Sequence, residues 1–540
     1  MSFKLVLVLF LYFLPAISTQ DYEDITVIIK GSATEAEIDD NFVCATIDWW
    51  PPEKCNYNQC PWGQSSVLNL NLNHTYISKA IKAFKHLRIR VGGSLQDQVT
   101  YGVGSLELPC DPFSKMSGGL FGFSEGCLSL SRWDELNLLF LRTGAVVTFG
   151  LNALFGRHRV GKGIWRGSWN SSNARDFIEY TISKGYPVDS WEFGNELSGH
   201  GVGAKVDSQQ YAKDLIILKA MLDELYKNSS SKPLLVAPGG FFDDQQWYAE
   251  LLEVSGPGVL NALSHHVYNL GAGNDPKIER RIMNPQHLSQ FADTFRNVKL
   301  TIERHGPWSS AWVGEAGGAY NSGSLLVSNT FLNSFWYLDQ LGMASKYNTK
   351  VYCRQTLIGG NYGLLDTKTF KPNPDFYSAL LWHKLMGKEV LTIDISGSPF
   401  LRAYAHCRKD GTGVTLLLIN LSESSVFRVW VRNDLNVDLA EGGGIERDSS
   451  FMHGLKQTVS WVGAKASDGS QTREEYHLTA KDGRHLSRIM LLNGTPLQLN
   501  EDDEIPELSP LLVAVNSPLV LDPVSIAFVV FPSFEARACA

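Results

Sequence analysis

The chain of 540 residues carries 48 Lys and Arg against 56 Asp and Glu, which gives a net charge of −8, and 44% of its residues are hydrophobic. This acidic balance argues against a partner such as nucleic acid, which binds proteins through concentrated positive charge. The length is ample for two hydrophobic cores.

The N-terminus has the pattern of a secretory signal peptide. Lys4 precedes an apolar run over residues 5–14 and small residues at 16 and 18, so we expect a signal peptide over residues 1–19. A signal anchor is disfavoured because this run is too short to span a bilayer. The predicted location is secreted, in the extracellular matrix or cell wall, with the lysosome or vacuole as the alternative. No transmembrane segment is expected in the mature chain, and peripheral membrane association stays open.

Apolar strands alternate with amphipathic helices in the next part of the chain. The eight expected strands lie near residues 46–48, 87–91, 146–150, 191–196, 234–237, 262–268, 312–315 and 351–355. This alternation favours an α/β fold, a (β/α)8 TIM barrel, whose active site forms where the strands end.

Two of the intervening helices have clear limits. One is expected over residues 173–184, closed by Gly185. The other begins after Pro285 and ends at Gly306, with apolar side chains from Leu288 to Ile302 on one face. We predict a single helix for this second segment.

After about residue 388, short strands separated by turn residues replace this pattern. Strands are expected over residues 403–406, 414–419, 427–431 and 524–531, which is typical of a C-terminal β-sandwich. The predicted organisation is a signal peptide (1–19), an N-terminal strand that is a candidate to join the sandwich (20–42), the catalytic barrel (43–388) and the β-sandwich (389–540).

Glycosylation and disulfide signals fit an oxidising compartment. Eight cysteines should mostly pair, although their connectivity does not follow from the sequence. A bridge between Cys407 and Cys539 would tie the last strand to the sandwich, whereas Cys353, inside a strand, is expected to be a buried free thiol. A zinc site at Cys55 and Cys60 is disfavoured for lack of histidines at ligand spacing, so neither metal nor cofactor is expected. Five Asn-x-Ser/Thr sequences are candidate glycosylation sites: Asn73, Asn170, Asn228, Asn420 and Asn493.

Two glutamates stand at the ends of expected barrel strands. Glu196 ends the fourth strand and Glu315 the seventh, each next to glycine. Either one alone is more often a solvated loop residue. Together, at the same end of a barrel, they indicate glycoside hydrolysis, which needs one carboxyl as proton donor and another as nucleophile.

Seven short blocks carry a resemblance that covers nearly all of the mature chain. They are ATID at 45–48, LRIRVGGS at 87–94, FGLNAL at 149–154, SWEFGNE at 190–196, HHVY at 265–268, GE at 314–315 and GNY at 360–362. In this order they resemble the heparanase-like proteins and β-glucuronidases of glycoside hydrolase family 79. The resemblance implies that Glu196 is the proton donor and Glu315 the nucleophile.

The strand-end positions of these blocks and the family pattern also give the expected substrate-binding residues. Asn195 is placed to bind the sugar 2-hydroxyl. Polar side chains would bind other hydroxyls and a uronic acid carboxylate, and glycine-rich backbone would donate N–H groups to that carboxylate. The full set is Asp48, Ser94, Asn195, His265, Tyr268, Gly317, Gly318, Gly360, Asn361 and Tyr362.

The chain departs from heparanase in its charge. The segment after the fifth strand, 239–245, contains two Asp and no Lys or Arg, and 269–272 contains no arginine. An acidic surface would repel a sulfated polyanion. We therefore expect a retaining β-glucuronidase acting on glucuronic acid of extracellular glycans or glucuronide conjugates. The alternatives are a heparanase-type endo-β-glucuronidase that cleaves heparan sulfate proteoglycans and an inactive carbohydrate-binding protein.

Overall fold

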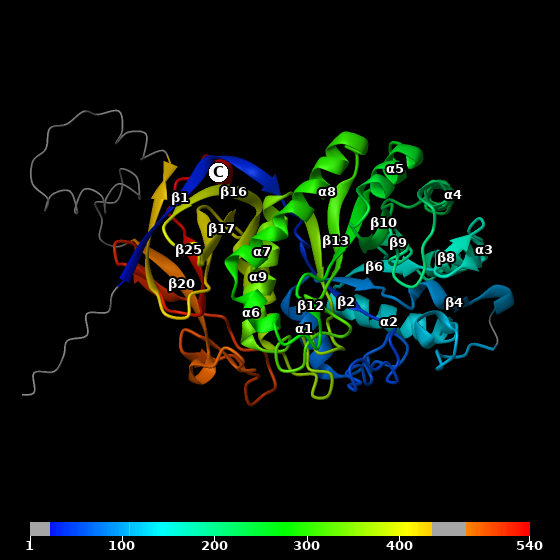
Figure 1. Ribbon diagram of the computed structural model, residues 1–540, viewed down its shortest axis with the longest axis horizontal. Helices are drawn as coiled ribbons and strands as arrows, with labels where there is room; N and C mark the ends of the chain where they lie inside the picture. The colour runs from blue at the N-terminus through cyan, green and yellow to red at the C-terminus, as the bar shows by residue number, and fades with distance from the viewer. Residues whose placement is uncertain (1–21, 107–108, 435–470) are drawn as a thin grey trace, which may run out of the picture.

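The computed structural model describes residues 22–106, 109–434 and 471–540, and its centre is a closed barrel of eight parallel strands (Figure 1). In chain order the strands are β2 Val43–Ile47, β3 Arg88–Val91, β6 Val146–Leu151, β9 Ser190–Phe193, β10 Leu234–Phe241, β11 Ala262–Val267, β13 Ser310–Ala316 and β15 Thr349–Arg354. β15 pairs with β2 and closes the ring. Each strand lies where the sequence predicts it, so the barrel prediction is confirmed.

Helices surround the barrel between successive strands. They are α1 Thr75–Ala83, α2 Leu130–Thr143, α3 Ser172–Ser183, α4 Ser208–Leu225, α5 Gln245–Ser255, α6 Ile278–Ile282, α7 Pro285–Gln290, α8 Ala292–His305, α9 Phe331–Lys346 and α10 Pro374–Leu385. α3 matches its predicted limits within a residue, and Gly185 follows it with φ +68°.

The second predicted helix is wrong in one respect, since α7 and α8 are two helices that meet at Phe291. The Phe291 N–H donates to the carbonyl of Leu288, three residues back, so the regular bonding pattern is interrupted there. The apolar face is nevertheless buried as expected, because Leu288, Phe295 and Val298 are all 0–1% exposed.

The C-terminal part forms an eleven-stranded sheet beside the barrel (Figure 1). Its strands are β16 Met386–Ser396, β17 Leu401–Arg408, β18 Val414–Asn420, β19 Val426–Asn433, β20 Thr472–Ala480, β21 Met490–Leu492, β22 Thr495–Pro496, β23 Leu511–Ala514, β24 Leu519–Leu521 and β25 Ser525–Phe531, joined by β1 Tyr22–Glu37. β1 lies between β16, which it pairs with antiparallel, and β19, which it pairs with parallel. The N-terminal strand therefore joins this sheet, while the domain boundaries stay a prediction.

Apolar side chains of β1 alternate with half-buried ones and enter a core of their own. Ile25, Val27 and Ile29 are 0–1% exposed and belong to a cluster with residues of β17, β18 and β25. Three two-stranded ladders complete the described strands: β4 Val99–Gly102 with β5 Gly126–Ser129, β7 His158–Gly161 with β8 Ile164–Arg166, and β12 Gly271–Ala272 with β14 Ala319–Tyr320.

All eight cysteines form disulfides, and one of the four pairs corrects a prediction. Cys44–Cys353 joins neighbouring barrel strands, because β2 and β15 bring the two residues into register with their Cα atoms 4.1 Å apart. Cys353 is therefore not a free thiol. The predicted Cys407–Cys539 bridge is present. The other pairs, Cys55–Cys60 and Cys110–Cys127, close short loops.

The glycosylation candidates divide by exposure. Asn73, Asn170 and Asn228 are exposed. Asn420 is fully buried and its amide nitrogen donates to the carbonyls of Ser425, Leu521 and Asp522, so a glycan on this nitrogen is incompatible with the fold and the prediction is wrong. The amide of the half-buried Asn493 donates to the carbonyls of Glu475 and Ser509.

The predicted signal peptide lies outside the described residues. Within the parts that are described, no helix has both the length and the apolar character needed to span a bilayer.

We expect Val27→Asp to lower the free energy of unfolding by at least about 3 kcal/mol, because it loses apolar burial and places an unpaired carboxylate in the core of the C-terminal sheet. Thr26→Asp is the matched control, since Thr26 is half-buried on the opposite face of the same strand. Urea unfolding would measure both. An equal, small loss in the two variants would contradict the assignment of β1 as a core strand.

Candidate active site

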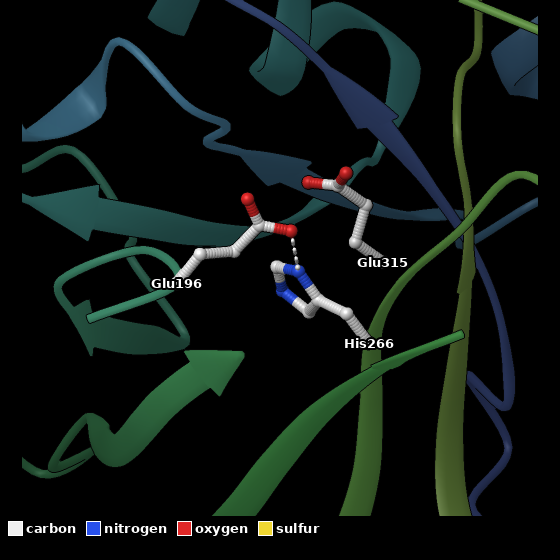
Figure 2. A group of neighbouring side chains, drawn as sticks. All are labelled: Glu196, His266 and Glu315. Carbon is white, nitrogen blue, oxygen red and sulfur yellow. Dashed lines mark hydrogen bonds and ion pairs between the residues drawn. The ribbon is translucent and has the colours of Figure 1, made fainter. Parts of the chain in front are cut away.

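Glu196 and Glu315 meet at the ends of the barrel strands. Figure 2 shows their carboxyl groups turned toward one another beside His266, and one ligating atom from each of the three residues lies within 4.8 Å of the others. Glu196 lies in the turn after β9, beyond Gly194 and Asn195, with φ +55°, and its N–H donates to the carbonyl of Gly239 at 2.7 Å. Both glutamates are only 6% exposed.

A pairing irregularity orients Glu315. β11 and β13 are in regular register up to His265 and Val313, but the next residue, His266, pairs with Glu315 instead of Gly314. Such a bulge changes the face on which a side chain lies. It brings Glu315 beside the inward-facing His266.

Two donors hold the carboxylate of Glu315. Arg90 Nη1 donates to Oε2 at 2.9 Å, and the Tyr268 hydroxyl donates to Oε1 at 2.5 Å. A carboxyl group that accepts from a guanidinium and a hydroxyl at once is matched to its ionised form, which is an acceptor only. Glu315 is therefore suited to act as an anion.

Arg90 connects the residues below the pocket. It lies in β3, is 1% exposed, and donates through Nε to Glu192 at 2.6 Å and through Nη2 to the Asn195 side-chain oxygen at 2.8 Å. Its third contact is Glu315. The planar guanidinium presents these donors in a fixed fork, which lysine cannot reproduce.

Glu196 has a different environment. Burial raises its pKa to about 7, against the opposing effect of the Arg90 charge. Its Oε1 lies 3.1 Å from His266 Nδ1 (Figure 2), and burial lowers the pKa of His266 to about 3, so this imidazole is neutral and the contact is not an ion pair. Glu196 can thus hold a proton at neutral pH, as a general acid must.

The two glutamates line a pocket of about 310 Å³. Aromatic side chains form much of its wall: Trp50, Trp62, Phe121, Phe241, Tyr268, Tyr320 and Tyr362. A larger hollow of about 420 Å³ lies between α9 and strands β16 and β17, but neither glutamate lines it. The smaller pocket is therefore the candidate active site, with flat apolar surfaces suited to sugar rings.

Several predicted substrate-binding residues are located at this pocket. Ser94, Tyr268 and Tyr362 line it. Asp48 lies beneath and accepts from Gln355 Nε2 at 2.7 Å; burial and the nearby Glu315 charge raise its pKa to about 7. Asn195 is 4% exposed, and its side-chain nitrogen is buried without a partner, while its backbone N–H donates to Asp97.

The glycines predicted to donate backbone N–H groups divide into two kinds. Gly317 and Gly360 lie against the pocket tyrosines: a Cβ on either one would come within 2.7 Å of Tyr268 or Tyr362, so only glycine fits there. Gly318 instead has Leu270 and Trp336 as its nearest neighbours.

The backbone prediction for Asn361 is wrong. Its N–H donates to the carbonyl of Ser322 at 2.7 Å, and its side chain donates to Gln59 and to Gly323. The N–H is therefore not available to bind a ligand.

His265 is not a site residue, and this prediction is corrected to His266. His265 is 1% exposed and packs edge-on against Phe295 of α8, with ring centroids 5.7 Å apart. Side chains alternate along β11, so Ser264 and His266 face the barrel interior while His265 faces the helices. The sequence places two histidines side by side and does not show which of them faces the barrel interior.

Other residues of the site were not predicted, among them Arg90, Gln355, Trp50 and Lys54. For Arg90 a signal existed, because a charged residue inside a fully buried strand requires a buried partner. Gln355 directly follows β15, so it stands at the same end of the barrel as the two glutamates. Trp50 and Lys54 lie in a loop whose path depends on the Cys55–Cys60 bridge, which the sequence did not establish.

Glu196, His266 and Glu315 also have the geometry of a metal-ligand group among the described residues. Both oxygens of Glu315 already accept hydrogen bonds, and the cation beside it is Arg90. The arrangement is explained by hydrogen bonding within the protein. The expectation that no metal or cofactor is used stays a prediction.

We expect Arg90→Met to lower the free energy of unfolding by about 3–5 kcal/mol at pH 7, since it leaves the carboxylates of Glu192 and Glu315 buried without a cation. Uncompensated burial raises a carboxyl pKa, and a group with a raised folded pKa loses stability as pH rises, so the deficit should shrink toward pH 5.

The matched control for this prediction is Arg88→Met. Arg88 is equally buried in the same strand, but the side chain of its partner Asp189 is 36% exposed and can be rehydrated. Urea unfolding of both variants at the two pH values is the measurement. Equal losses of unfolding free energy in the two variants would show that the Arg90 contacts do not stabilise the fold more than those of Arg88.

Comparison with known proteins agrees with this site. The family model described as glycosyl hydrolase family 79, N-terminal domain, matches residues 24–342. Heparanase-like protein 2 of Arabidopsis thaliana is 58% identical over 97% of this chain and 97% of its own length. Baicalin-beta-D-glucuronidase of Scutellaria baicalensis is 40% identical over 94% of this chain and 93% of its own.

A solved structure supports the fold. The 4-O-alpha-L-rhamnosyl-beta-D-glucuronidase of Fusarium oxysporum 12S covers 94% of this chain and 100% of its own with a TM-score of 0.62, at 15% sequence identity. Together with the family match and the near-full-length relatives, the paired carboxylates at the barrel rim show that this chain belongs to glycosyl hydrolase family 79 and is a glycoside hydrolase.

Proposed function

We propose that the protein is a retaining β-glucuronidase that removes glucuronic acid from extracellular glycans or glucuronide conjugates. The observation that carries the mechanism is the short separation of the two carboxyl groups, whose nearest oxygens lie within 4.8 Å. Retaining enzymes hold them roughly 5–5.5 Å apart, whereas inverting enzymes leave about 6.5–9.5 Å for a water molecule.

The different environments of the two glutamates support the division of roles. Glu315, held by Arg90 and Tyr268, attacks the anomeric carbon as the bond to the leaving oxygen breaks. Glu196, whose pKa is raised to about 7, gives its proton to that oxygen. A water then enters, Glu196 takes back a proton, and the bond between Glu315 and the sugar is hydrolysed.

The pocket supplies groups for a uronic acid. The buried Asn195 side-chain nitrogen, without a partner in the protein, is placed to donate to the sugar 2-hydroxyl as positive charge develops. Ser94 and Tyr362, which line the pocket, offer further polar groups, and Asp48 positions the lining residue Gln355. The names of the relatives support the same substrate class, since one is a baicalin-beta-D-glucuronidase and another is heparanase-like.

Heparanase-type endo-cleavage of heparan sulfate is the second candidate, favoured by the heparanase-like relative. The net charge of −8 opposes it, and so does the pocket lining, which among the described residues contains one Lys and no Arg, because a long sulfated chain needs an extended basic groove. An inactive carbohydrate-binding protein is disfavoured by two hydrogen-bonded, correctly spaced glutamates. The secretory route stays part of the proposal, supported by four disulfides.

Substitution of the two glutamates tests the roles. Glu315→Gln should abolish turnover of every β-glucuronide, since no glycosyl-enzyme can form. Glu196→Ala should reduce hydrolysis of a phenyl glucuronide by roughly 10²–10⁴-fold but spare the formation of glycosyl-enzyme from a dinitrophenyl glucuronide, whose leaving group needs no proton. Burst kinetics on both substrates, with circular dichroism as a folding control, would measure this.

Two results would overturn the assignment. One is an equal loss on activated and unactivated substrates in folded Glu196→Ala. The other concerns the wild type: proton NMR should show the β-anomer of glucuronic acid first, and initial release of the α-anomer means inversion.

The pH profile should report the proton on Glu196. Because its pKa is raised to about 7, the acid is protonated below that pH and ionised above it, so kcat/KM for a phenyl glucuronide should fall tenfold per pH unit on the alkaline side. With a dinitrophenyl leaving group this alkaline limb should flatten.

Asp48 provides the control, because its pKa is also raised to about 7. Asp48→Asn should keep the alkaline limb if that limb belongs to Glu196. Loss of the limb in Asp48→Asn would assign the titration to Asp48 instead.

A further inference from the structure

The charges around the pocket are unbalanced. Glu196 and Glu315 line it and Asp48 lies beneath, whereas Lys54 is the only Lys or Arg among the lining residues identified in the described parts of the chain. Arg90 is already engaged by three acceptors below the floor. A substrate that brings its own carboxylate into this pocket would therefore meet one available cation.

Lys54 is held in place by its loop. The Cys55–Cys60 disulfide closes the segment that follows it, and the Lys54 N–H donates to the carbonyl of Pro51 at 3.0 Å. Its ammonium lies 3.9 Å from the centre of the Trp50 ring. Trp50 is itself fixed by neighbouring rings, including Trp62 and Phe121. The cation is pre-positioned at the pocket, which reduces the entropy lost when it binds a ligand.

The Lys54 ammonium has no anionic partner. Across the three described segments no carboxylate forms an ion pair with its nitrogen, although much of the side chain is removed from water. Burial lowers its pKa from the usual value, and the charge of Asp48 acts in the opposite direction. A partly buried lysine without a counter-ion is costly, and a substrate anion would remove that cost.

We propose that Lys54 is the specificity residue that binds the carboxylate of the substrate and makes the enzyme prefer anionic sugars to neutral ones. This inference rests on the proposed function and adds a residue that the motifs of the chain did not indicate. The carboxylate contact is made in both the ground state and the transition state. Lys54 therefore acts mainly on KM, with little effect on kcat.

The test compares Lys54→Met with the wild type on two matched substrates, a nitrophenyl β-glucuronide and the corresponding β-glucoside, which has a hydroxymethyl group in place of the carboxylate. Methionine keeps an apolar stem over Trp50 and removes the charge. We expect KM for the glucuronide to rise about 10- to 100-fold, the range for a hydrogen bond to a charged group, with kcat within about twofold of the wild type. KM for the glucoside should not rise.

Lys54→Arg provides the conservative variant and should restore most of the preference for the glucuronide, because it returns a cation to the loop. Lys79→Gln is a control for loss of one positive charge, since Lys79 pairs with Glu504 away from the pocket. Its kinetic constants should match the wild type. The thermal unfolding temperature of each variant would show whether the substitution has disturbed the fold of the loop.

The outcomes separate this inference from the proposed function. Suppose that the wild type prefers the glucuronide. If Lys54→Met keeps that preference, or weakens the binding of both substrates equally, then Lys54 only packs against Trp50 and the inference is wrong. If the wild type does not hydrolyse the glucuronide, the proposed function fails and the inference fails with it. Selective loss of glucuronide affinity, recovered by Lys54→Arg, supports the inference.

Discussion

The site depends on one buried guanidinium. Arg90 extends from β3 into the barrel and binds Glu192, Glu315 and Asn195, which come from two further strands and the turn after one of them. A buried cation is tolerated only when its donors and charge are satisfied, so this network fixes the relative positions of the strand ends. Glu315 and Asn195, the residue beside Glu196, are therefore held by the same side chain. Because Glu196 is the next residue after Asn195, the Arg90–Asn195 hydrogen bond also limits where Glu196 can lie.

Burial gives Glu196 and Glu315 opposite properties because their partners differ. Glu315 accepts from a guanidinium and a phenol, and both contacts favour the anion. Glu196 contacts His266, which burial keeps neutral. Desolvation favours the protonated form of the Glu196 carboxyl group. One pocket thus holds a carboxylate bound by two donors and, within 4.8 Å of it, a carboxyl group whose pKa is raised to about 7.

The sequence predicted more of the fold than of the active site. Apolar runs separated by helix signals located every barrel strand, because burial on both faces of a parallel strand leaves a strong pattern. Contacts between strands were not predictable in the same way. The bond between Cys44 and Cys353 depends on register, the choice of His266 over His265 depends on which face each occupies, and the burial of Asn420 depends on a turn 100 residues away in sequence. Each of these follows from tertiary pairing, which a local pattern does not contain.

The place of β1 has a consequence for how the protein is made. β1 precedes the whole barrel in the chain, yet it lies inside the C-terminal sheet, hydrogen-bonded to β16 on one side and β19 on the other. During synthesis β1 is made before the barrel, and its two partners, β16 and β19, are made after it. The two edges of β1 are therefore not both paired until β19 has been synthesised. Until then its uncovered edges and its apolar residues are open to pairing with other chains, so we expect β1 to be a site where a chaperone binds the incomplete chain.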